Sequence, residues 1–174
     1  MIQLAEKIKI DFLKDKNSFP IEKTLNTNVI EILIKFIKKK KALNRTPIGL
    51  CEFLDVLALI ASEKGAVVDR LVEIRIIEIA SDLLWHEHSE AKKSALTILS
   101  NIALTSFEYR EQIIEEEYEN ILEFLLSKKI KKISESLKTH LSLLLMALFR
   151  GPPYQSSQTV NQSFWSSSHS YPFR

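Results

Sequence analysis

The side chains whose types and spacing come nearest to a metal-binding site are His86 and His88, which flank Glu87. Side chains at i and i+2 of a helix diverge, and zinc sites take three or four protein ligands. No Cys and no third His lies near this pair in the sequence. The pattern therefore favours a turn that precedes a helix, and we expect no metal site and no cofactor.

The chain also lacks the motifs that are typical of enzymes. It has no Gly-rich phosphate loop and no Gly-flanked Ser nucleophile. The single cysteine, Cys51, has no activating His or cationic neighbour, so we interpret it as a small buried hydrophobic residue. One cysteine excludes an internal disulfide and suits a reducing compartment. We expect no catalytic site.

Two runs of like charge are candidates for binding. Lys38–Lys41 is compatible with a localisation signal or a phosphate-binding patch, but the end of a helix is the favoured interpretation because cations suit that pole of the helix dipole. Glu115–Glu117 is favoured as a solvated face over a contact for a basic partner. The net charge of +2 comes from 24 basic and 22 acidic residues that are interleaved, so no nucleic-acid partner is expected.

The hydropathy pattern argues against a membrane span and against a signal peptide. The longest apolar run, Leu143–Phe149, is far shorter than the roughly 18 residues that span a bilayer. Met1–Lys16 alternates charged with apolar residues and has no signal-peptide core. We expect a cytoplasmic and nuclear location and no membrane partner.

An apolar phrase occurs three times along the chain, the third time more loosely: Leu54–Ser62, Leu96–Leu104 and Leu143–Arg150. Aligning Leu59, Asn101 and Ala147 gives spacings of 42 and 46 residues. A period in this range is typical of stacked helical repeats of the armadillo or HEAT kind. Such repeats cannot bury their apolar faces alone, and stacking them forms a concave surface that suits binding.

The remaining pattern predicts which helices form these repeats. Helices are expected over 5–16, Ile21–Leu25, Val29–Lys40 and about Ile48–Ser62, and the short–long–long order recurs after Glu63 and after Ser106. With 3 Gly and 5 Pro, the chain has few helix breakers. We predict an all-α solenoid of about three stacked helical repeats, of the armadillo or HEAT kind, over residues 1–150.

The composition changes at Gly151, where a segment rich in Ser, Gln, Asn and aromatic residues begins. We interpret 151–174 as a disordered tail, with the alternative that Trp165 packs onto the last helix. That helix is apolar around most of its circumference over Leu143–Phe149. Its outer face lacks the polar capping that solenoids need at their ends, so we expect self-association through it.

Several short segments in a fixed order resemble the first armadillo repeats of importin-α, the cytosolic adaptor for basic nuclear localisation signals. The resemblance covers roughly residues 5–153, and it implies an all-α armadillo-repeat α-solenoid, a right-handed superhelix of about three repeats. The segments that carry it are Phe12–Ile21, Asn28–Ile30, Phe36–Ile37, Ala58–Ser62, Ser100–Ala103 and Leu148–Pro152.

The resemblance implies a peptide-binding groove on the third helices of the repeats. In that family each third helix carries a Trp and, four residues later, an Asn, which share one helical face. The Trp rings hold Lys side chains by cation–π contact, and the Asn amides bond the peptide backbone. The Trp positions correspond to Asp55, Thr97 and Leu143, and the Asn positions correspond to Leu59, Asn101 and Ala147.

The resemblance therefore implies an adaptor that binds protein or peptide cargo for import into the nucleus, with Asn101 as the retained anchor. The alternative is a divergent armadillo interaction module whose groove takes an apolar segment or another solenoid. A third alternative is a divergent copy without transport activity. The basic N-terminal arm that binds importin-β in that family is not recognisable in Met1–Lys16, so importin-β is not an expected partner.

Overall fold

The computed structural model describes residue 10 and residues 29–43, 49–63, 65–127 and 134–150. Helix is the regular secondary structure of these residues, and no strand occurs among them. The helices are α3 (Val29–Leu43), α4 (Leu50–Ala61), α5 (Ala66–Glu73), α6 (Ile76–Leu83), α7 (Ser89–Thr105), α8 (Phe107–Leu126) and α9 (Glu135–Leu148). The helix predicted over Ile21–Leu25, most of that over 5–16, and the tail 151–174 lie outside the described residues.

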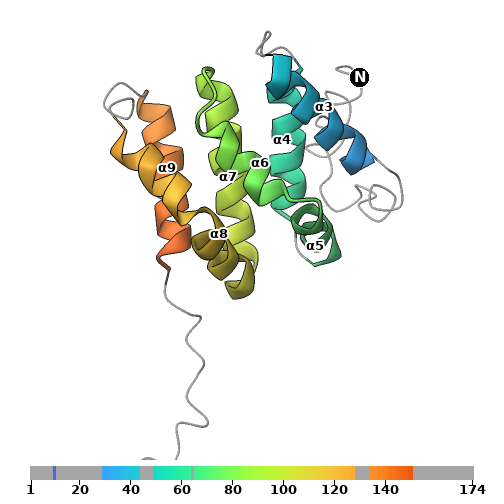
Figure 1. The fold of residues 1–174 in the computed structure, drawn as a ribbon. Helices are drawn as coiled ribbons and strands as arrows, with labels where there is room; N and C mark the ends of the chain where they lie inside the picture. The colour runs from blue at the N-terminus through green and yellow to red at the C-terminus, as the bar shows by residue number, and fades with distance from the viewer. Residues whose placement is uncertain (1–9, 11–28, 44–48, 64, 128–133, 151–174) are drawn as a thin grey trace, which may run out of the picture.

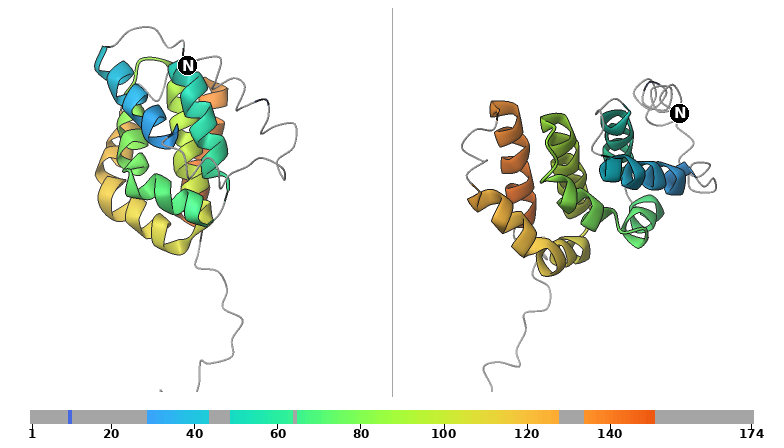
Figure 2. Two further views of the ribbon diagram at one scale, coloured as in Figure 1. Left: turned by 90° about the vertical axis from the view of Figure 1, so that its right-hand side faces the viewer. Right: turned by 45° about the horizontal axis from the view of Figure 1, so that its top comes forward.

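Three helices, α4, α7 and α9, stand side by side as one layer (Figure 1). The central helix α7 packs against α4 on one side and against α9 on the other. The other helices form a second layer, in which α3 packs on α4, and α6 and α8 pack on α7 and on each other. Figure 2 shows the same succession of stacked helix groups from a second direction. This arrangement is that of a short solenoid.

The repeated apolar phrases form the contacts between the stacked helices. Leu54 and Leu57 on α4 and Leu96 and Leu99 on α7 are completely buried. Ala95, Ile98 and Ile102 on α7 also have no exposed surface. Burying each large side chain stabilises the fold by about 1.5–3 kcal/mol. Because the buried residues are those of the repeated phrases, the core has the same period as the sequence.

Local signals determine where the helices begin. Gly49 precedes α4 with φ of 90°, a left-handed conformation that costs glycine nothing, and its N–H donates to Glu52 Oε2 at 2.6 Å. Ser106 and Ser134 cap α8 and α9, because their hydroxyl oxygens accept from the N–H groups of Tyr109 and Leu137. These caps satisfy donors that the first turn of a helix leaves without a partner.

The short–long–long order predicted for each repeat is wrong in two places. After Glu63 the structure has two short helices, α5 and α6, because Arg75 between them adopts a left-handed φ of 66° and breaks the helical path. After Ser106 the chain forms one continuous helix, α8, which contains no Gly or Pro that would interrupt it. Lys38–Lys41 lies in the last turns of α3, as predicted for a helix end.

Candidate peptide-binding groove

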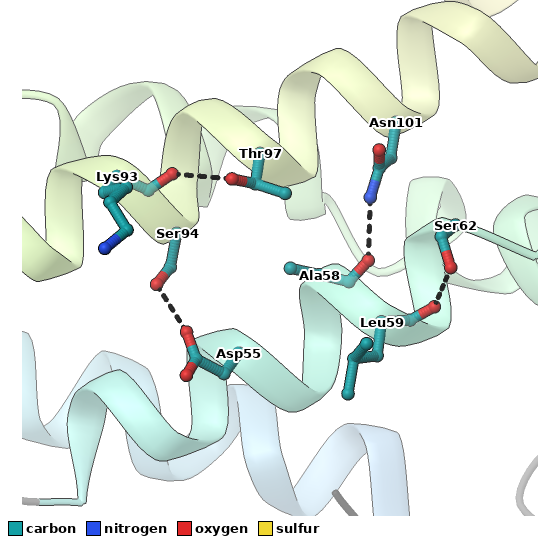
Figure 3. A pocket seen from close by; sticks show the side chains of 8 residues that line it. All are labelled: Asp55, Ala58, Leu59, Ser62, Lys93, Ser94, Thr97 and Asn101. Carbon is teal, nitrogen blue, oxygen red and sulfur yellow. Dashed lines mark hydrogen bonds between the residues drawn. The ribbon is translucent and has the colours of Figure 1, made fainter. Parts of the chain in front are cut away.

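A cavity of about 230 Å³ opens between α4 and α7 (Figure 3). Polar and small side chains line it. From α4 and its C-cap these are Asp55, Ala58, Leu59 and Ser62, and from α7 they are Lys93, Ser94, Thr97 and Asn101. The residues of α7 recur at three- and four-residue intervals and therefore share one face of that helix.

Two hydrogen bonds cross the cavity and join the helices (Figure 3). Near one end, Ser94 Oγ donates to Asp55 Oδ1 at 2.8 Å. Near the other, Asn101 Nδ2 donates to the backbone oxygen of Ala58 at 2.9 Å. The bonds connect residues that are 39 and 43 positions apart in the sequence, so they link one repeat to the next.

The bond from Asn101 satisfies a carbonyl at the end of a helix. In a continuing α-helix the Ala58 oxygen would accept from the N–H of Ser62. That N–H instead bonds to Leu59 O at 3.0 Å, so the Ala58 oxygen accepts the Asn101 amide from the neighbouring helix. The second hydrogen of the amide and its oxygen make no hydrogen bond to a described residue, which leaves one donor and one acceptor for a ligand.

Among the described residues, three carboxylates and one cation act on the thiol of Cys51, near the Asp55 end of the groove. Burial raises the pKa of this thiol, and the charges of Glu52, Asp55 and Glu90 raise it further. Lys93 is the one cation among the groups that act on this pKa, and its Nζ forms an ion pair with Glu90 Oε2 at 2.7 Å. A positively charged ligand would therefore be favoured at this end.

Four of the six residues expected in the groove come together in this cavity: Asp55, Leu59, Thr97 and Asn101. Leu59 is half-buried and offers apolar surface, whereas the Thr97 hydroxyl donates back to Lys93 O on its own helix at 2.9 Å. The lining does not include Leu143 or Ala147, which belong to α9.

The two α9 residues differ in their exposure. Leu143 is 50 % exposed, whereas Ala147 is 2 % exposed and belongs to the core. The expectation that Ala147 contributes groove surface is therefore wrong. Its single methyl group lies close to the helix backbone and is enclosed where α9 packs on α7.

Sequence reasoning missed Lys93, Ser94 and Ser62 as groove residues. Ser94 lies three positions before Thr97, and Lys93 lies four positions before it, so both fall on the Thr97 face of α7. This spacing was the signal from which Lys93 and Ser94 could have been predicted as groove residues. Ser62 caps the end of α4, where its hydroxyl donates to Leu59 O at 2.6 Å, and no helical period marks such a position.

The other candidates from the sequence have structural roles. The rings of His86 and His88 lie 5.2 Å apart, and the His88 N–H donates to His86 Nδ1 at 3.2 Å in the turn before α7. Within the described ranges no three His, Cys, Asp or Glu residues are grouped so that they could hold a metal ion. Over the same ranges, no helix has the length and apolar character to cross a membrane.

No protein-family model matches this chain, and no curated protein matches it. Two engineered proteins of known structure have a similar fold. The first, an engineered protein solved by crystallography as a structural genomics target, has a TM-score of 0.64 and 20% identity, over 78% of this chain and 52% of its own. The second, a designed armadillo repeat protein, has a TM-score of 0.59 and 19% identity, over 74% of this chain and 50% of its own.

These likenesses define the fold. The chain is an all-α solenoid of armadillo repeats, as its sequence period predicts. It spans about half the length of each of the two similar structures. The resemblance to importin-α is carried by the sequence motifs and not by these comparisons.

Proposed function

We propose that this chain is a protein-interaction module that binds an extended peptide or protein segment in the groove between α4 and α7. The observation that supports this proposal is the position of Asn101 on the groove wall, where its amide keeps a donor and an acceptor for a ligand. An extended peptide presents backbone N–H and C=O groups in alternation, and one amide side chain can bond both. Leu59 beside it offers apolar contact for a ligand side chain.

The narrower form of the proposal is that the ligand is a basic segment of the nuclear-localisation type, which would make the chain an adaptor between cytoplasm and nucleus. The carboxylate of Asp55 on the groove wall favours a cationic side chain there. No Trp occurs among the described residues that line the cavity, so a Lys gains no cation–π contact from them. Each exposed ion pair adds about 0.2–1 kcal/mol, so we expect a dissociation constant between about 10 µM and about 1 mM.

A second candidate ligand is an apolar segment. The half-exposed Leu143 on α9 favours it, because this side chain stands where the importin-α pattern has a Trp, two helices along from Asp55 in the same layer. A ligand that reached from the α4–α7 cavity to α9 would meet apolar surface at that point. Its affinity would depend little on salt.

The test is fluorescence anisotropy with three labelled peptides of equal length: Lys-rich, the same sequence with Gln for Lys, and Leu-rich. Asp55→Asn keeps an acceptor for Ser94 and removes the charge, so it should weaken the Lys-rich peptide about 2–5-fold. Glu111→Gln is the matched control, because it removes an exposed charge on α8 outside the groove.

Asn101→Ala should weaken whichever peptide binds by about 2–10-fold through loss of backbone hydrogen bonds. Preference for the Leu-rich peptide, with no effect of Asp55→Asn, would select the apolar ligand and reject the basic one. If none of the three peptides bound at about 1 mM, the equivalent of roughly 4 kcal/mol, the groove proposal itself would be wrong.

A further inference from the structure

A second cavity, which is apolar, lies between α8 and α9. Its volume is about 90 Å³ and every residue that lines it is apolar or aromatic. We name the residues that line this cavity, together with Met146, the terminal face. Its members with accessible surface are Ile114, Tyr118, Leu122, Leu125, Leu145, Met146 and Phe149.

The terminal face continues the stacking surface of the earlier helices. By the spacing of the repeats, Met146 occupies the position of Ala58 on α4 and Ser100 on α7. Ala58 is 8 % exposed and Ser100 is 6 % exposed, and each belongs to a helix whose next neighbour in the layer packs on it. Met146 is 70 % exposed, so within the described part of the chain α9 has no helix packed on it in the corresponding place.

The residues at this end are large where the inner positions are small. Phe149 is 72 % exposed and Tyr118 is 48 % exposed. Taking about 200 Å² for a fully exposed large side chain, the terminal face presents roughly 500–600 Å² of apolar surface, at the upper limit for the patches of monomers.

We infer that the terminal face binds the same face of a second copy of this chain. An isologous contact buries the same patch on both subunits, so one interface covers the terminal face of both copies at once. The exposed apolar area approaches the roughly 800 Å² that each partner contributes to a stable interface, and polar rim atoms supply the difference.

The apolar lining of the cavity favours this pairing. In the described part of the chain no charged residue lines the cavity, so two copies meet without like charges from this lining at the centre of the contact. A charged or polar partner would gain little from such a surface, whereas an identical apolar one gains on both sides.

The experiment is sedimentation velocity of the full chain from about 1 µM to about 100 µM, a range that brackets typical homodimer affinities. We expect a species of twice the 20.1 kDa of one chain. Met146→Glu and Phe149→Glu each place a charge in the interface, and each should weaken the dimer by about a hundredfold or more. Both positions are exposed, so the helix content should not change.

Leu104→Glu is the matched control, because Leu104 is 52 % exposed on α7 and does not belong to the terminal face. It should leave the dimer intact. A chain that stays monomeric over the whole range, or a dimer insensitive to both glutamates, would overturn the inference. Monomers in which Phe149→Glu increases the quenching of Trp165 fluorescence by iodide, measured in a Trp85→Phe background, would replace the second copy with the chain's own segment 151–174.

Discussion

The hydrogen bond from Asn101 Nδ2 to Ala58 O should contribute measurably to stability (2.9 Å). Asn101→Ala removes the donor and leaves the Ala58 carbonyl, at a buried residue near the end of α4, without the partner that it has in the fold. An unsatisfied buried acceptor costs about 1–3 kcal/mol, and because Asn101 is only half-buried we expect about 1–2 kcal/mol.

For a domain of this size that loss lowers the melting temperature by about 3–6 °C. The assay is circular dichroism at the helical minimum, with thermal and urea unfolding of the same samples. Thr97→Val is the control on the same helix, because the Thr97 hydroxyl bonds only within α7 among described residues. Its removal should change the free energy of unfolding by less than about 0.5 kcal/mol.

Equal melting temperatures for the wild-type chain and Asn101→Ala would refute the structural role of this amide. The result also controls the binding experiments. A loss of peptide binding in Asn101→Ala, measured at least 20 °C below its melting temperature, reports the ligand contact rather than partial unfolding, since about 1–2 kcal/mol leaves a marginally stable domain of about 5–15 kcal/mol folded.

Two further predictions concern contacts between the repeats outside the groove. The hydrogen bond to Asp69 raises the pKa of Tyr109 to about 12. Because folding favours the protonated phenol, the contribution of this bond is complete below pH about 10, the pKa of an unfolded tyrosine, and disappears as the pH rises through 12. Ultraviolet titration should show this late ionisation, and Tyr109→Phe should abolish the associated loss of stability. In a second network, Asn120 accepts from Trp85 Nε1 at 2.5 Å and donates to the fully buried Ser81 Oγ at 2.9 Å. Asn120→Ala should therefore cost about 2–3 kcal/mol in urea unfolding, and a cost below about 0.5 kcal/mol would show that the network does not stabilise the fold.

The sequence predicted the inner helices well because they are strongly periodic. Leu54, Leu57, Leu96 and Leu99 follow helical spacing, and burial of apolar surface is the largest favourable term in folding. The break at Arg75 was not predictable, since a left-handed conformation at a residue other than Gly is uncommon and has no local signature.

The candidate groove was predictable only in part. The resemblance to importin-α gave the positions of Asp55, Leu59, Thr97 and Asn101, which the fold brings together. The partners that these side chains use inside the protein depend on contacts about 40 residues apart. Ser94 meets Asp55 across 39 residues, and no local pattern encodes such a pair.

The small residues Ala58 and Ser100 also bear on how far apart the proposed groove would contact a bound peptide. Ala58 and Ser100 let successive helices of the inner layer approach closely, and closely packed helices lie about 8–10 Å apart. An extended chain advances about 3.3 Å per residue. A peptide lying across α4, α7 and α9 would therefore pass from one helix to the next every two to three residues. Its side chains at that interval would contact successive helices.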